Sequence, residues 1–198
     1  MRCLYPRVIR NPSKQFLGLD FSYSQEGEPV LTDTGELVPQ TLTVPCGKCV
    51  LCLEERRNAW ATRMELESRL WPSTSFVTLT YNEQSVPDQL KKYDLQKFFK
   101  RLRKTCDCRY FACGEYGTHG RPHYHAIIWH RFSDSDFQRL VEDKWSFGFV
   151  LVKPGNRDNF RYVAKYTIKL AGTHPEGKQS PFALMSRRPG ISGSDSAY

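Results

Sequence analysis

Residues 109–129 read RYFACGEYGTHGRPHYHAIIW, which is the pattern of a β-hairpin. Its two arms, RYFACGE and HYHAIIW, are rich in aromatic and β-branched residues, and they flank the short loop YGTHGRP. Successive side chains of a strand point to opposite faces, so His123 and His125 share one face. If the loop closes symmetrically, Glu115 lies opposite His123 on that face. The hairpin therefore brings one carboxylate and two imidazoles together.

One carboxylate and two imidazoles can bind a divalent cation and leave coordination positions open, as a catalytic site requires. A His-x-His pair alone is weak evidence, because surface histidines and hydrogen-bonded core histidines often produce it. Glu115 strengthens the metal interpretation. In the same register Cys113 faces His125, so a zinc site with cysteine and histidine ligands is the alternative. His119 and His130 have no such neighbour and are interpreted as structural or solvent-facing.

The sequence around the hairpin alternates further strands and helices. Strands are predicted from β-branched and aromatic content at 75–81, 109–115, 123–129 and 147–153. Helices are predicted from the spacing of apolar residues at 53–71, 95–104, 133–145 and 158–170, with Asp94 as the cap of the second. This order predicts an α+β fold with a mainly antiparallel sheet and helices packed on it.

Three of the seven cysteines lie in CGKCVLC, and neighbours so close do not suit an ordinary disulfide framework. A reducing cytoplasm and a metal site fit better. Cys46, Cys49 and Cys52 have the spacing of zinc ligands, and a tetrahedral structural site needs a fourth. Cys106 and Cys108 are candidates for it. The alternative is three buried thiols without a metal.

The chain divides by composition into three parts. Residues 1–52 form a loop-rich, cysteine-containing N-terminal segment with a hairpin and apolar pieces around 16–21 and 37–44. Residues 53–185 form the folded α+β domain, and 186–198 are predicted to be a flexible tail.

The charge balance favours a polyanionic partner. Lys and Arg outnumber Asp and Glu by 29 to 21, which gives a net charge of +8. The chain contains no apolar run of about 20 residues, and residues 1–6 lack a signal-peptide core, so no membrane partner is expected. A basic helix face either binds DNA or only improves solubility; its residues are Lys97, Lys100, Arg101, Arg103 and Lys104.

The helix predicted at 158–170 contains YVAKYTIK, in which Tyr-x-x-Lys occurs twice. On an ideal helix Tyr162, Lys165, Tyr166 and Lys169 fall within an arc of roughly 100°, so the tyrosines are predicted to face outward together. Two phenols beside two ammonium groups suit repeated phosphoryl transfer, because each lysine can stabilise a phenolate. The alternative is an aromatic surface ridge.

Three segments in order, FVTLTY, GEYGTHGRPHYHAIIW and YVAKYTIK, resemble the motifs of HUH-type replication initiators, in which two histidines bracket a bulky residue, here Tyr124. CGKCVLC and LMSRRPGI add a similarity to the initiators of gokushoviruses, single-stranded DNA phages of the microvirus family (Microviridae). The resemblance covers roughly residues 44–190.

This resemblance implies the HUH endonuclease fold, which is RRM/ferredoxin-like with about five strands. It implies that Glu115, His123 and His125 bind Mg²⁺ or Mn²⁺. It also implies that an early cysteine, Cys3, is the fourth ligand of a structural Zn²⁺.

The implied activity is nicking of single-stranded or cruciform origin DNA through a covalent 5′-phosphotyrosine, followed by strand transfer in rolling-circle replication. One tyrosine cleaves first and the second cleaves the regenerated origin; Tyr162 is expected to act first.

The implied setting is the cytoplasm of the bacterial host, with a host polymerase. No Walker A pattern occurs, so unwinding is expected from a host helicase. Two alternatives are a non-catalytic, zinc-dependent nucleic-acid-binding module and a relaxase or transposase of the same superfamily.

Overall fold

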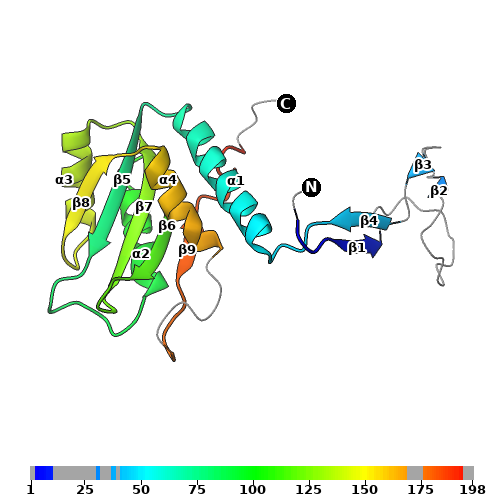
Figure 1. Cartoon of the computed structure of the whole chain (residues 1–198). Coiled ribbons are helices and arrows are strands. Elements are labelled where there is room, and N and C mark those ends of the chain that lie inside the picture. Colours follow the sequence, from blue (N-terminus) through cyan, green and yellow to red (C-terminus); the bar gives the residue numbers. More distant parts are fainter. Residues whose placement is uncertain (1–2, 11–29, 32–36, 39–40, 169–175, 194–198) are drawn as a thin grey trace. The chain divides into compact units, whose positions relative to one another are not determined.

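The computed structural model describes residues 3–10, 30–31, 37–38, 41–168 and 176–193 (Figure 1). They belong to two compact units, Met1–Glu55 and Arg56–Tyr198. In the described residues no helix is long and apolar enough to cross a membrane.

The first unit contains two short antiparallel strand pairs. Its strands are β1 (Arg7–Arg10), β2 (Val30–Leu31), β3 (Leu37–Val38) and β4 (Thr41–Val44). β1 pairs with β4, and β2 pairs with β3. The apolar piece expected at 16–21 lies outside the described residues. The piece at 37–44 supplies β3 and β4.

The second unit is built on one antiparallel sheet. Its strands are β5 (Ser73–Thr80), β6 (Arg109–Tyr116), β7 (Pro122–His130), β8 (Val150–Pro154) and β9 (Phe182–Met185). The strand order is β8-β5-β7-β6-β9, and all neighbours are antiparallel. The predicted α+β class with an antiparallel sheet is therefore confirmed. The edge strand β9 is not among the strands that the residue pattern predicts.

Helices cover both faces of this sheet (Figure 1). They are α1 (Val50–Ser68), α2 (Lys92–Leu102), α3 (Asp134–Lys144) and α4 (Arg157–Ala164), which the 3₁₀ turn η1 (Lys165–Thr167) follows. Because strand side chains alternate, the sheet has two distinct cores. One joins α2 and α3 to Tyr124, Ala126 and Ile128. The other joins α4 and the last turns of α1 to Ile127 and Trp129.

Helix starts follow local hydrogen bonds, with one correction. Ser133 caps α3 and Asn156 caps α4, as their side chains accept backbone N–H groups. Asp94 does not cap α2: the helix begins at Lys92, and the Asp94 carboxylate instead accepts the Tyr81 hydroxyl at 2.9 Å. A contact between core and first turn thus replaces the predicted cap.

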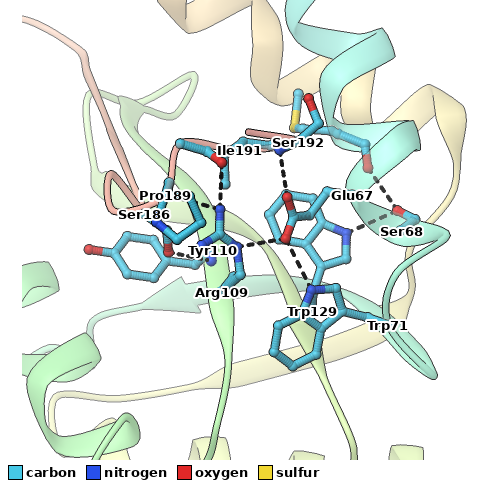
Figure 2. Close-up of polar contacts among 12 residues, drawn as sticks. Glu67, Ser68, Trp71, Arg109, Tyr110, Trp129, Ser186, Pro189, Ile191 and Ser192 are labelled. Atoms are coloured by element: carbon cyan, nitrogen blue, oxygen red, sulfur yellow. Dashed lines mark hydrogen bonds and ion pairs between the residues drawn. The ribbon is translucent and has the colours of Figure 1, made fainter. Parts of the chain in front are cut away.

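The segment 186–193, predicted as part of a flexible tail, packs onto the second unit (Figure 2). Its Ile191 side chain is buried. Arg63 donates two hydrogen bonds to the Ile191 carbonyl at 3.0 and 2.8 Å. Ser186 exchanges hydrogen bonds with the Tyr110 backbone, which extends the β9 pairing. Residues 194–198 of that predicted tail lie outside the described residues.

A buried carboxylate, Glu67 of α1, lies at the centre of these contacts (Figure 2). It accepts hydrogen bonds from Arg109 Nε at 2.6 Å, Trp71 Nε1 at 3.0 Å and the Ser192 amide at 2.6 Å. Arg109 Nη2 also donates to the carbonyls of Pro189 and Gly190. The ion pair therefore fastens the C-terminal segment to α1 and β6.

Arg109→Ala is expected to lower the free energy of unfolding by about 3–5 kcal/mol, because it leaves the buried Glu67 carboxylate unpaired. Urea unfolding followed by circular dichroism measures it. The control is Arg69→Ala, whose exposed ion pair with Glu65 contributes less than about 1 kcal/mol. Equal losses in the two variants would contradict this role of the Glu67 cluster.

Candidate functional site

The hairpin of β6 and β7 brings three potential metal ligands together. The predicted register is confirmed: Glu115 pairs with His123, and Cys113 pairs with His125. The Nε2 atoms of His123 and His125 lie 2.9 and 2.8 Å from the same oxygen, Glu115 Oε1. The ligand atoms of all three residues lie within 4.8 Å of one another. This spacing suits three ligands of one cation.

Hydrogen bonds on the far side of each ring fix how the histidines present their nitrogens. His123 Nδ1 lies 3.2 Å from the Arg121 carbonyl, which can only accept, so Nδ1 carries the hydrogen. His125 Nδ1 lies 3.0 Å from Thr78 Oγ1, and Phe76 stacks on the ring. In its neutral form, His123 therefore aims an Nε2 lone pair at Glu115.

A lone pair and a carboxylate oxygen at this distance need positive charge between them or on the ring. Either a proton or a metal ion can supply it. Burial alone would raise the pKa of Glu115, but hydrogen bonds from His123, His125 and Tyr162 together hold this pKa well below its usual range. Glu115 is thus a carboxylate ready to bind a cation.

The competing cysteine and the other histidines lie elsewhere. Cys113 is buried on the same sheet face, but its sulfur is not part of the group of converging ligand atoms in the described chain. His130 is buried against Phe137 and hydrogen-bonds Ser75, and burial lowers its pKa to about 4. It is a neutral core residue. His119 is exposed in the hairpin loop.

Tyr162 reaches the metal ligands from α4. Its hydroxyl donates to Glu115 Oε1 at 2.6 Å, and its ring packs edge-on against His125 with centroids 5.2 Å apart. Burial, followed by the neighbouring Glu115 charge, raises the pKa of Tyr162. The outward orientation predicted for this side chain is therefore wrong: Tyr162 points into the site.

Tyr166 is also not on an exposed helix face. The helix predicted at 158–170 ends at Ala164, where Thr167 Oγ1 donates to the Ala164 carbonyl and the chain turns as η1. The turn places the Tyr166 ring in the core, 4% exposed and 6.0 Å from the ring of Tyr162.

Lys165 is the lysine that the structure places beside both tyrosines. Its Nζ lies 3.5 Å from the ring centroid of Tyr162 and 4.9 Å from that of Tyr166. Both rings therefore share one cation. Lys169 lies outside the described residues.

Next to the site, one part of the sheet face is open, which the sequence analysis does not anticipate. Phe149 is 70% exposed and Leu151 is 49% exposed. Thr80 exchanges backbone hydrogen bonds with Phe149 and pairs with His123 on its other side. The alternation in FGFVLVK holds the signal, because every second residue faces this side.

The basic helix lies on the opposite face. α2 packs on the core around Tyr124, whose side chain points away from the histidines. Four of the five predicted DNA-binding residues are exposed: Lys97, Lys100, Arg103 and Lys104. Arg101 instead donates two hydrogen bonds to the Lys144 carbonyl and joins α2 to the end of α3.

A second cluster of potential metal ligands lies in the N-terminal unit. The sulfurs of Cys3, Cys46, Cys49 and Cys52 lie within 4.8 Å of one another, and all four are free thiols. Cys3 Sγ lies 3.9 Å from Cys49 Sγ, and Cys46 Sγ lies 4.0 Å from Cys52 Sγ. Tetrahedral zinc with Zn–S bonds of about 2.3 Å places sulfurs about 3.8 Å apart. The cysteines fit this geometry.

Backbone amides also favour thiolates in this cluster. The amides of Lys48 and Cys49 donate to Cys46 Sγ at 3.4 and 3.3 Å. Donors from the backbones of Cys52 and Leu4 lower the pKa of Cys49 to about 6. Thiolates are the form that binds zinc.

We expect the purified protein to contain about one zinc per chain, bound by these four cysteines. A Cys46→Ser, Cys49→Ser double variant should lose it, because two thiolates are too few to hold zinc tightly. Elemental analysis of protein purified without chelator measures the ratio. Cys106→Ser is the control, since Cys106 lies outside the cluster; loss of zinc in that variant would contradict the assignment of Cys3.

Comparisons with known proteins agree with the motifs. Residues 74–171 match the family model of replication-associated protein ORF2. The chain is 28% identical to replication-associated protein ORF2 of Spiroplasma virus 4 over 87% of this chain and 62% of the relative. It is 31% identical to replication-associated protein ORF4 of Chlamydia phage 1, over 64% and 38%. The chain therefore spans less than two thirds of either relative.

Among solved structures, the chain is similar to the hypothetical protein ORF119 of Sulfolobus islandicus rod-shaped virus 1. The TM-score is 0.36 at 19% identity, over 60% of this chain and 97% of that one. Likeness at this level says nothing of function. The family model and the phage relatives agree with each other, and the chain belongs to the phage replication-associated proteins of the microvirus type.

Proposed function

We propose that the chain is a metal-dependent endonuclease and strand transferase that nicks single-stranded origin DNA through Tyr162. The contact that carries the proposal is the 2.6 Å hydrogen bond between the Tyr162 hydroxyl and Glu115 Oε1. The same oxygen faces both histidine nitrogens. A phenol so close to three metal ligands can attack a phosphate that the metal holds.

The proposed step is a transesterification. The Tyr162 oxygen forms a bond to phosphorus, and the bond from phosphorus to O3′ of the upstream nucleotide breaks. The phenol gives up one proton and the leaving O3′ takes one up, so the strand ends in a free 3′ hydroxyl. The reverse step, with another 3′ hydroxyl, transfers the strand and frees the tyrosine.

The residues of the site divide the work. Glu115, His123 and His125 would hold Mg²⁺ or Mn²⁺, which supplies Lewis acidity to the phosphate. The Lys165 ammonium lies 3.5 Å from the Tyr162 ring centroid and can stabilise the phenolate. Tyr166 acts in the second cleavage of a replication round, after its buried ring has moved. Its 4% exposure supports Tyr162 as the first nucleophile.

The open sheet face supports a single-stranded substrate. Phe149 and Leu151 lie two strands away from the histidines, and aromatic side chains on such a face bind unpaired bases by stacking. The substrate would be origin DNA in single-stranded or cruciform form. Replication in the cytoplasm of the host would further require a host helicase and polymerase.

Tyr162→Phe should form no covalent adduct with a single-stranded origin oligonucleotide in the presence of Mn²⁺, because the attacking oxygen is gone. A denaturing gel detects the adduct as a slower protein band. The control is Tyr93→Phe, since Tyr93 is exposed on α2 and far from the ligands in the fold; it should keep the band. Chelator should abolish it.

An adduct of full intensity from Tyr162→Phe would show that another residue attacks. DNA binding without any adduct in the unmodified protein would favour the non-catalytic zinc-dependent module.

Phe149→Ala should weaken binding of single-stranded DNA by about 1–3 kcal/mol for the lost stacked base, and Phe149→Trp should keep it. Fluorescence anisotropy in chelator measures binding without turnover. Leu66→Ala removes an exposed apolar side chain of α1 and serves as the control. An equal effect of both alanine variants would remove the open face from the DNA path.

A further inference from the structure

A groove of about 410 Å³ lies where the C-terminal segment meets α2. It opens beside Tyr110, whose ring belongs to the α2 core and not to the core under α4. Four of its lining residues are cationic, and we call it the arginine groove: Lys92, Arg103, Arg187 and Arg188. No acidic side chain is among the described residues that line it. The groove is therefore strongly positive.

These charges are available to a ligand. Lys92, Arg103, Arg187 and Arg188 are all exposed. In the described part of the chain, no hydrogen bond or ion pair engages their side-chain nitrogens. Four unpaired cations around one hollow repel each other, and an anion relieves this repulsion.

The groove is also rigidly supported. Ser186, just before the two arginines, exchanges hydrogen bonds with the Tyr110 backbone at 3.1 and 3.0 Å. After them, the Glu67–Arg109 pair holds the carbonyls of Pro189 and Gly190. The arginines are thus presented by a segment that is fixed on both sides, which lowers the entropy cost of binding.

An aromatic side chain forms the floor. Tyr110 stacks on Phe99 of α2 with centroids 3.5 Å apart and planes 8° from parallel. Burial raises the pKa of Tyr110, while the charges of Arg103 and Arg187 lower it, so both guanidinium groups act on this hydroxyl. The floor and the cations converge.

The positive strip continues along α2. An adjoining hollow shares Arg103 and Tyr110 and adds Lys100 and Lys104. A row of cations of this length matches a polymer with one negative charge per nucleotide better than a single small anion.

We propose that the arginine groove binds a second stretch of DNA backbone, separate from the strand at the metal ligands. The inference rests on the proposed function for its choice of polyanion. On β6, Tyr110 and Glu115 point to opposite sheet faces, because they are an odd number of residues apart. DNA that occupies both sites must pass around the β9 edge of the sheet.

The test is an Arg103→Gln, Arg187→Gln double variant. Its binding to single-stranded oligodeoxythymidine of about 8 and about 30 nucleotides is measured by anisotropy in chelator across a salt series. For the long oligonucleotide, the slope of log K against log salt should fall by about 1.4, since each lost phosphate contact removes about 0.7. Affinity at low salt should fall about tenfold or more.

The matched control is Arg69→Gln, Arg139→Gln, which removes two exposed arginines outside the groove. It should leave the slope unchanged. Nicking of a short origin oligonucleotide should be equal in the unmodified protein and both variants.

An unchanged slope in the groove variant would overturn the proposal, even if nicking is normal. Equal loss of binding to short and long oligonucleotides would also overturn it, because the groove would then belong to the strand at the metal site. Absence of nicking in every protein, with the slope change present, would contradict the proposed function and leave the groove supported.

Discussion

The pairing of β6 with β7 is the constraint on which the site depends. A slip of one residue in this pairing would turn the histidines away from Glu115 and towards the α2 core. The loop fixes the register: the Gly117 amide donates to the Arg121 carbonyl at 2.9 Å, and Gly120 adopts a φ of 73°, which favours glycine. The three ligands therefore converge through backbone geometry that the side chains do not need to supply.

The residue between the histidines holds the same strand from the other side. Tyr124 is buried, and its hydroxyl lies 2.7 Å from the hydroxyl of Tyr81 and bonds the backbone of Lys91 at 2.9 and 3.0 Å. A bulky residue at this position thus locks β7 to the start of α2. The metal-facing side chains can remain partly accessible because the stabilising contacts of this strand lie on its opposite face.

Local patterns predict the parts of the fold that depend on local physics. The hairpin, its register and the convergence of Glu115 with His123 follow from a period of two, which needs no knowledge of distant residues. The helix end at Ala164 and the burial of Tyr166 do not follow, because the Thr167 side chain competes with the helical pattern. These details decide which tyrosine reaches the ligands.

Long-range contacts account for the other differences. The segment 186–193 has the composition of a tail, but Glu67, which binds the Ser192 amide, is 125 residues away in the chain. The cysteine cluster shows the same limit: three members are close in sequence, whereas Cys3 is brought in over 46 residues from Cys49. Spacing alone cannot choose such partners, and only the motif similarity pointed to Cys3.

Strand β6 has a further consequence as a spacer. It carries Tyr110 near one end and Glu115 near the other, and five residues of strand measure about 17 Å. A strand within a sheet neither stretches nor shortens appreciably, so this separation along the strand is constant. Any nucleic acid that touches both ends is measured against a ruler of fixed length, and the distance from the gripped nucleotide to the cut one is set by the protein.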